Sequence, residues 1–203
     1  MNVGDFMITG APWLLIAIGF SLVLFTADDL SRFLLHRVMH KYDSLWRLHR
    51  VHHSATTLTP FTVFRTHPIE SLLYFLRGFL VFSFVTGIAL WLFRGQLTAL
   101  EILGVEAIGF TFNMLFANLR HSHIYLTFGR LERWIISPAQ HQLHHSKTHG
   151  HPNYGACFAL WDQLIGSLRK SDPKHLRTPL EFGLTADESR HPIKESTSVQ
   201  SYA

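Results

Sequence analysis

Cysteine is almost absent from this chain: Cys157 is the only one among 203 residues. A single cysteine cannot form an internal disulfide, and it cannot supply the several thiolates that Cys-based zinc sites and iron–sulfur clusters require. A metal bound by this chain must therefore be held by nitrogen, with oxygen as the other available ligand.

Other absences exclude further classes of protein. The chain has no His-Glu-x-x-His string, which a membrane zinc hydrolase with a glutamate base would need. It lacks the pair of Glu-x-x-His motifs that a di-iron carboxylate bundle uses, and it lacks the glycine fingerprint of a dinucleotide-binding domain. The net charge of +4 comes from scattered residues and not from a basic tract, so we expect no nucleic-acid partner.

Charged residues are also scarce, at 16%, whereas 47% of the chain is hydrophobic. Three long apolar segments are each long enough to cross a bilayer: residues 6–26, residues 78–93 with an apolar extension back to Leu72 across Arg77, and residues 97–119. The first has no basic residues before it, unlike a signal peptide, so we expect it to be a retained helix. The alternative is that the second and third segments are buried helices of a soluble protein.

Lysine and arginine are distributed unevenly around these segments. None precedes the first segment, and only Arg94 lies between the second and the third. Six lie between the first and second segments, and ten follow the third. By the positive-inside rule, this pattern predicts that both large polar regions are cytoplasmic and therefore lie on the same side of the membrane.

Histidine is abundant and clustered. The string His-x-x-His-His occurs twice, and residues at i, i+3 and i+4 share one face of a helix, so each copy should present three imidazoles in one direction. With a third pair at i,i+4 spacing and a fourth small cluster, ten of the 15 histidines fall in four places. These ten candidate metal ligands are His36, His40, His49, His52, His53, His121, His123, His141, His144 and His145.

Ten imidazoles are too many for one ion, whereas two ions with four or five nitrogen ligands each would use them. Short capped helices suit such a site. Ser137, Pro138 and Gln140 form a capping-box pattern that predicts the start of a helix carrying the second triple. Residues 28–42 should continue the first span as a helix. For one member of each triple, the alternative to ligation is a hydrogen bond to a neighbouring ligand.

Seven strings, in this order along the chain, carry a specific resemblance. They are His-Arg-Val-Met-His at 36–40, Leu-Trp-Arg-Leu-His-Arg-Val-His-His-Ser at 45–54, Arg-Thr-His-Pro-Ile-Glu at 65–70, Arg-His-Ser-His at 120–123, Ile-Ser-Pro-Ala-Gln-His-Gln-Leu-His-His-Ser at 136–146, Asn-Tyr-Gly at 153–155 and Leu-Trp-Asp at 160–162. With them the chain resembles the fatty acid hydroxylase / sterol desaturase superfamily, over roughly residues 26–185.

The resemblance implies an all-α integral membrane protein with about three transmembrane helices and a cytoplasmic helical cap that carries the histidine boxes. It implies two iron ions bound by the ten histidines, and O2-dependent hydroxylation or desaturation of a sterol, fatty acyl or related lipid. Electrons would come from a separate donor of the cytochrome b5, ferredoxin or reductase type. The enzyme domain would cover residues 1–185, and residues 186–203 would form a polar, disordered tail.

Several residues depart from the pattern or have secondary roles. His151 stands where the superfamily often has Asp, with an additional His149 nearby, and His123 stands where Asn is usual. His67 precedes Pro68 and is expected to cap the second span. One of two acidic residues, Asp28 or Asp29, is expected to hydrogen-bond a ligand imidazole, and a similar supporting role is expected for Asp162.

Two rival functions remain open from the sequence. A metal transporter or metal-storage protein would have ligands in the middle of its spans, whereas the histidine boxes here flank the apolar segments. A non-catalytic, metal-binding relative would have the same residues as the enzyme.

Overall fold

The computed structural model describes residues 12–93, 96–176, 178 and 180–189. These residues are helical or irregular and contain two isolated β-bridges but no strand, as the all-α prediction requires. The elements are α1 (Trp13–Lys41), α2 (Asp43–His53), η2 (Pro60–Phe64), α3 (Pro68–Leu92), α4 (Ala99–Arg120), η3 (Gly129–Arg133), α5 (Pro138–His144), α6 (Leu160–Ile165) and η4 (Pro173–Leu176).

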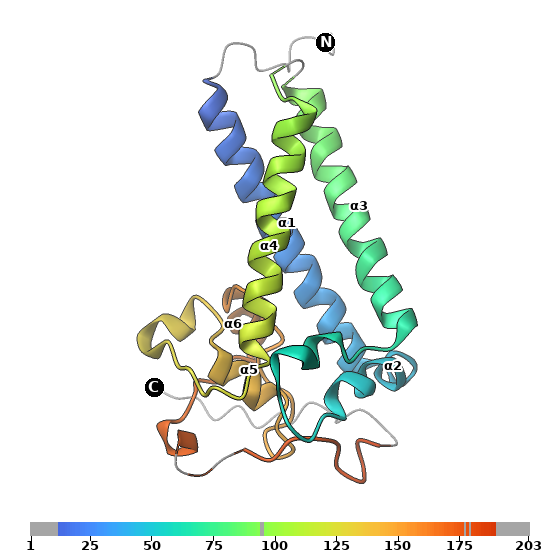
Figure 1. Cartoon of the computed structure of the whole chain (residues 1–203), viewed down its shortest axis with the longest axis vertical. Helices are drawn as coiled ribbons and strands as arrows, with labels where there is room; N and C mark the ends of the chain where they lie inside the picture. Colours follow the sequence, from blue (N-terminus) through green and yellow to red (C-terminus); the bar gives the residue numbers. More distant parts are fainter. Residues whose placement is uncertain (1–11, 94–95, 177, 179, 190–203) are drawn as a thin grey trace.

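Three of these helices, α1, α3 and α4, are long and apolar enough to cross a membrane, which confirms the three predicted spans (Figure 1). Residues 6–11, the predicted start of the first span, lie outside the described part of the chain. Helix α1 runs without interruption for 29 residues and includes most of the predicted continuation. Helix α3 begins at Pro68, four residues before Leu72, where the predicted second segment starts, because His67 and Pro68 provide a helix start there.

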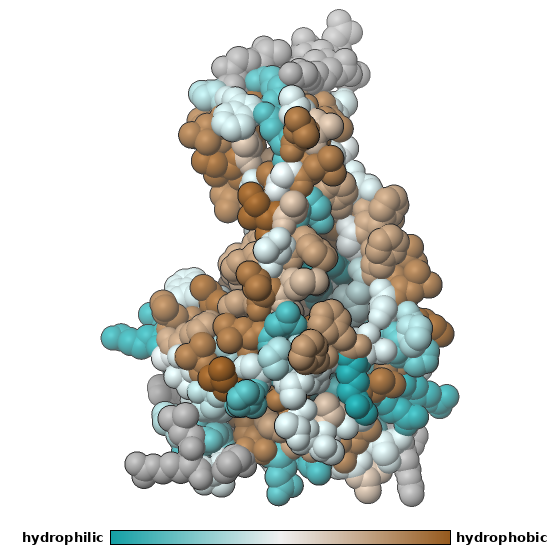
Figure 2. All heavy atoms as spheres, viewed as in Figure 1, coloured by the Kyte–Doolittle hydropathy of each residue, from teal (hydrophilic) through white to brown (hydrophobic). Residues whose placement is uncertain are grey.

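The spans carry their apolar side chains on the outside. Leu100, Ile108 and Phe84 are 82%, 73% and 70% exposed, and apolar residues cover much of the long helices in Figure 2. Only 11% of the most apolar stretch of α3 and 6% of that of α4 is buried. Buried helices of a soluble protein would show the reverse, so this alternative is wrong; the surface is suited to lipid.

A helical cap lies at one end of the spans and comprises α2, α5, α6 and the segments that join them (Figure 1). The predicted capping box at the start of α5 is confirmed. The Ser137 hydroxyl accepts from the Gln140 backbone at 3.2 Å, and the Gln140 side chain accepts from the Ser137 backbone at 2.9 Å. These bonds satisfy amides that a helix start otherwise leaves unpaired, so they hold the histidines of α5 in place.

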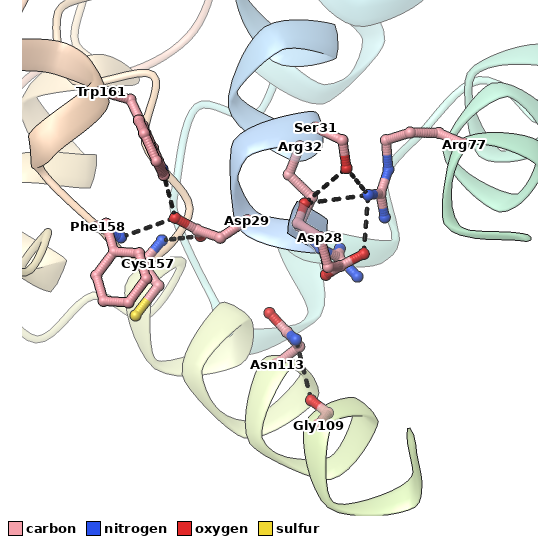
Figure 3. Close-up of polar contacts among 10 residues, drawn as sticks. All are labelled: Asp28, Asp29, Ser31, Arg32, Arg77, Gly109, Asn113, Cys157, Phe158 and Trp161. Carbon is pink, nitrogen blue, oxygen red and sulfur yellow. Dashed lines mark hydrogen bonds and ion pairs between the residues drawn. The ribbon is translucent and has the colours of Figure 1, made fainter. Parts of the chain in front are cut away.

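Asp29 fastens α1 to the cap. Its carboxylate accepts hydrogen bonds from the backbone of Cys157 at 2.7 Å and of Phe158 at 3.1 Å, and from the Trp161 indole at 2.8 Å (Figure 3). Neighbouring Asp28 instead pairs with arginines. The expectation that one of these carboxylates hydrogen-bonds a ligand imidazole is therefore wrong, because backbone, indole and guanidinium donors already engage their oxygens.

Candidate metal centre

Nine of the ten predicted histidines come together in two groups. Within each group the candidate ligand atoms all lie within 4.8 Å of one another. The first group contains His36, His40, His49, His53 and His144, and the second contains His52, His121, His141 and His145. Group sizes of five and four agree with the expectation of four or five nitrogens for each of two ions.

Each His-x-x-His-His triple divides between the two groups, which corrects the expectation that all three rings point the same way. On α2, His49 and His53 belong to the first group and His52 to the second. In the second triple the assignment is the opposite: His144 belongs to the first group, and His141 and His145 belong to the second. At about 100° per residue, positions i and i+4 are about 40° apart, whereas i+3 lies about 60° away on the other side. Each short helix can therefore serve two neighbouring ions.

The ring nitrogens of the second group converge. The Nε2 atom of His121 lies 3.0 Å from Nε2 of His52 and 3.0 Å from Nε2 of His141. The distance between Nε2 of His141 and Nε2 of His145 is 3.2 Å. Nitrogens at right angles around an ion, with bonds of about 2.0–2.1 Å, are about 3 Å apart, so these spacings fit a shared metal.

The first group leaves ring nitrogens without partners. The Nε2 atoms of His40, His49, His53 and His144 are buried and have no hydrogen bond. Each unsatisfied buried polar atom costs about 1–3 kcal/mol. Four such atoms in one cluster would be a large penalty, which a bound metal ion removes.

Hydrogen bonds from Nδ1, the ring nitrogen other than Nε2, fix the orientation of several rings. A backbone or carboxylate oxygen accepts from Nδ1 of four of the histidines, at 2.7–2.8 Å. The pairs are His36 with Tyr154, His49 with Glu70, His121 with Ala117, and His144 with Pro152. A proton on Nδ1 leaves the Nε2 lone pair free, which is the usual arrangement of a metal-bound histidine.

Electrostatics keep the imidazoles neutral. Burial, aided by the nearby His151, lowers the pKa of His49 to about 3. Burial and the proximity of His49 lower the pKa of His52 to about 4. Burial likewise places the pKa of His141 well below its usual value. Metals bind the neutral form of imidazole, so these rings are ready to bind a cation at neutral pH.

Glu70 contacts the histidine centre, although no role was predicted for it from the sequence. It is 1% exposed, and its Oε1 atom accepts the hydrogen bond from His49. Its position within one of the matching strings was the available signal. His67 in the same string caps α3, since its Nδ1 atom accepts from the Ile69 backbone at 3.2 Å, which confirms its predicted role.

The other histidines that the structure describes lie outside both groups. His123 is exposed. The Nδ1 atom of His149 lies 2.6 Å from the Ser146 hydroxyl. Both nitrogens of His151 are engaged, Nδ1 with the His144 carbonyl at 2.8 Å and Nε2 with a carboxylate oxygen of Glu188 at 2.6 Å.

Glu188 lies in the predicted polar tail, yet it is 1% exposed and packs against the centre. Its backbone carbonyl also accepts from the Trp46 indole at 2.9 Å. The described residues 186–189 are thus part of the site's surroundings. Residues 190–203, most of the predicted disordered tail, lie outside the described part of the chain.

The segment that holds the ring of His36 is itself held by Asp162. This buried carboxylate accepts from the backbones of Tyr154 at 2.8 Å and Gly155 at 2.7 Å. A Cβ atom at Gly155 would lie 2.7 Å from the Phe158 carbonyl oxygen, so only glycine fits. Asp162 therefore does not hydrogen-bond an imidazole, as was expected of it, and is linked to His36 only through the Tyr154 backbone.

Comparison with known proteins places the site in a family. The profile of the family described as fatty acid hydroxylase matches residues 21–167, more than half of the chain. This range includes all nine grouped histidines as well as Glu70 and Asp162, but it excludes Glu188.

Several curated proteins are similar in sequence. The ornithine lipid hydroxylase OlsE of Rhizobium tropici is 29% identical over 68% of this chain and 38% of its own length. The alkylglycerol monooxygenase of Homo sapiens is 25% identical over 83% of this chain and 33% of its own length. The Delta(7)-sterol 5(6)-desaturase ERG3B of Gibberella zeae is 28% identical over 93% of this chain and 54% of its own length.

The chain thus spans only about a third of the length of the first curated relatives that it matches. No solved structure gives a significant match.

Proposed function

The chain belongs to the fatty acid hydroxylase family, and we propose that it is an O2-dependent lipid oxygenase with a pair of histidine-bound iron ions. The relatives are a lipid hydroxylase, a monooxygenase and a sterol desaturase, which supports an oxidation of a lipid C–H bond by hydroxylation or desaturation. Membrane-capable helices beside the centre support a substrate that arrives from the bilayer.

One observation carries the proposal: nine imidazoles in two buried groups, with converging or unsatisfied ring nitrogens. Imidazole nitrogen suits iron, and the absence of clustered cysteines makes a structural zinc site a poor match. Bound iron would supply the redox chemistry that activates O2 for removal of hydrogen from the lipid. We propose the nine grouped histidines as the ligands and leave the exposed His123 out of the set.

The chain's own residues would hold this centre rigid. Glu70 and the carbonyls of Tyr154, Ala117 and Pro152 fix ring orientation through Nδ1, so each Nε2 atom keeps its direction. The spans and the cap would together form the oxygenase domain, which we place within residues 1–185, with Glu188 closing its surroundings.

The location of the centre favours an oxygenase over a transporter. His40 and His121 lie at the ends of α1 and α4 and not at mid-span, where a transported ion would bind. Both triples lie at the same end of the spans, in agreement with the two basic polar regions facing one side. We propose that this side is cytoplasmic and that a separate electron donor reaches the centre from there.

The test is O2 consumption by iron-loaded, detergent-purified protein that is supplied with a chemical reductant and a membrane lipid extract. We expect lipid-dependent O2 uptake, and products that gain one oxygen atom or lose two hydrogen atoms by mass spectrometry. Iron-loaded protein that consumes no O2 with any lipid fraction would instead support a non-catalytic, metal-binding relative.

A further inference from the structure

A cavity of about 620 Å³ opens beside the histidines. Its wall includes His36, His49 and His52 from the first half of the chain and His121 and His141 from the second. The volume is typical of sites that bind small ligands. Because both histidine groups face this cavity, it is the place where a substrate carbon would meet the centre.

Arg120, the last residue of α4, lies in the same wall and is 7% exposed. Its Nε and Nη1 atoms are buried and have no hydrogen-bond partner. Its guanidinium carbon lies 5.3 Å from the ring centre of Phe116, a cation–π contact, and the carboxylate of Asp29 attracts the guanidinium electrostatically without forming an ion pair with it.

The other arginines near the cavity have a carboxylate partner, which they share. Arg77 donates to Asp28 at 2.8 Å, and Arg32 donates to the same carboxylate at 2.7 Å (Figure 3). No such pair reaches Arg120 within the described residues, since Asp29 is occupied by donors from the cap and Oε1 of Glu70 by His49.

A guanidinium group with buried, unpaired N–H groups is energetically costly unless a ligand accepts hydrogen bonds from them. Oxygen acceptors are the groups that its planar fork of donors recognises. Bound metal ions would add positive charge nearby and make an acceptor more favourable still. Arg120 therefore has the features of a binding residue for an oxygen-bearing group next to the centre.

A second cavity, of about 660 Å³, adjoins the first between α1, α3 and α4. Arg32, Tyr74 and Phe110 line both cavities, so the two are neighbours. Aromatic and aliphatic side chains form most of its wall, including Phe25, Phe79 and Phe82. Four charged residues, Asp28, Arg32, Arg77 and Glu106, also line this cavity, and the apolar part of its wall suits hydrocarbon.

We propose that Arg120 binds an acceptor oxygen of an acyl lipid, from its carboxyl, ester or amide group, while the hydrocarbon chain extends into the second cavity. This inference rests on the proposed function and narrows its substrate class. Because Arg120 directly precedes His121 and shares its cavity, the oxidised carbon would lie near the oxygen-bearing end of the chain and far from its methyl end.

The experiment measures displacement of a fluorescent palmitate analogue from iron-loaded protein in detergent by palmitate, methyl palmitate or hexadecane. The three probes offer a charged acceptor, a neutral acceptor and none. We expect the wild type to bind the two oxygenated probes roughly 10–100-fold more tightly than hexadecane, as for charge-assisted hydrogen bonds. Arg120→Gln should reduce this preference to about 3-fold or less, and Arg120→Lys should retain part of it.

The matched control is Arg47→Gln, because Arg47 is exposed on α2, and it should keep the full preference. The iron content of Arg120→Gln should equal that of the wild type. A wild type without preference, a preference that survives in Arg120→Gln, or a loss of iron in that variant would each overturn the role of Arg120. Failure of the oxygenase proposal can be told apart from failure of the Arg120 role, because it would appear as absent iron or absent O2 uptake in the wild type.

Discussion

The long helices and the helical cap bury opposite kinds of side chain. In α4 only Ile102 and Arg120 are buried, and the outward-facing residues are largely apolar. In α5 all seven residues are buried, and four of them are histidine or glutamine. One half of the molecule is thus suited to a lipid surrounding, whereas the other holds polar groups away from solvent.

This difference identifies what stabilises each half. Lipid and the packing of α1 against α3 and α4 hold the spans, so their stability should not depend on a metal. The cap buries imidazoles whose Nε2 atoms lack partners, so its stability should depend on the ions that satisfy them. The contrast predicts that one half can be disrupted while the other stays intact.

The largest expected effect comes from removing the metal. A chelator should increase amide hydrogen exchange in α2 and α5 by about 100-fold or more, since a ligand at 100 times its Kd adds about 2.7 kcal/mol. Exchange in the central parts of α1, α3 and α4 should change by less than about 3-fold. Exchange measured by mass spectrometry in nanodiscs tests this, and a uniform rise in both halves would contradict it.

Acid should be the next strongest disruption, and only of metal-free protein. The pKa of His49 is lowered to about 3 and that of His52 to about 4, relative to 6.5 in the unfolded chain. Groups with a lowered pKa contribute stability that is fully present above pH 6.5 and is lost as the pH falls towards the folded value. Protease resistance of the apo cap should therefore fall steadily below pH 6.5; resistance that stays constant down to pH 4 would contradict this.

Replacement of Glu70 tests the support of a single ligand. Glu70→Ala removes the acceptor for Nδ1 of His49, and loss of such a partner typically lowers metal affinity about 10–100-fold. Glu101→Ala is the matched control, because Glu101 caps the far end of α4. Competition with a calibrated chelator measures the iron affinity of both variants, and equal affinities would show that Glu70 does not support the centre.

A smaller effect on stability is expected from adding a side chain at Gly155, where the cap has no room for a Cβ atom. Gly155→Ala places a methyl group against the Phe158 carbonyl and should destabilise the cap by about 1–3 kcal/mol. Gly87→Ala in α3 has no neighbour within 4 Å and should change stability by less than about 1 kcal/mol. Thermal unfolding of both variants in the same detergent gives the comparison, and the idea fails if Gly87→Ala is the more damaging.

Local patterns in the sequence predicted much of this arrangement. Apolar runs predicted the three spans, and the Ser137 capping box predicted the start of α5. Histidine spacing picked out ten candidate ligands, nine of which lie in the two groups. These features depend on contacts within a few residues, which a sequence pattern contains.

Contacts between distant segments could not be predicted in this way. Helix geometry separates the i+3 histidine of each triple from the other two, but which group each of them joins depends on how α2 and α5 face each other. Glu188 reaches His151 from 37 residues away, and Asp29 binds donors more than 120 residues later. Tertiary packing determines each of these contacts, and no local spacing encodes them.

The most direct test of the dimetal centre is the iron content of detergent-purified protein from iron-supplemented cells, beside a His144→Ala/His145→Ala variant that removes one ligand from each group. We predict about two iron ions per chain in the wild type, in line with two groups of four or five nitrogens, and loss of iron in the variant. Metal-free wild type, or a single zinc ion that the variant retains, would contradict the account.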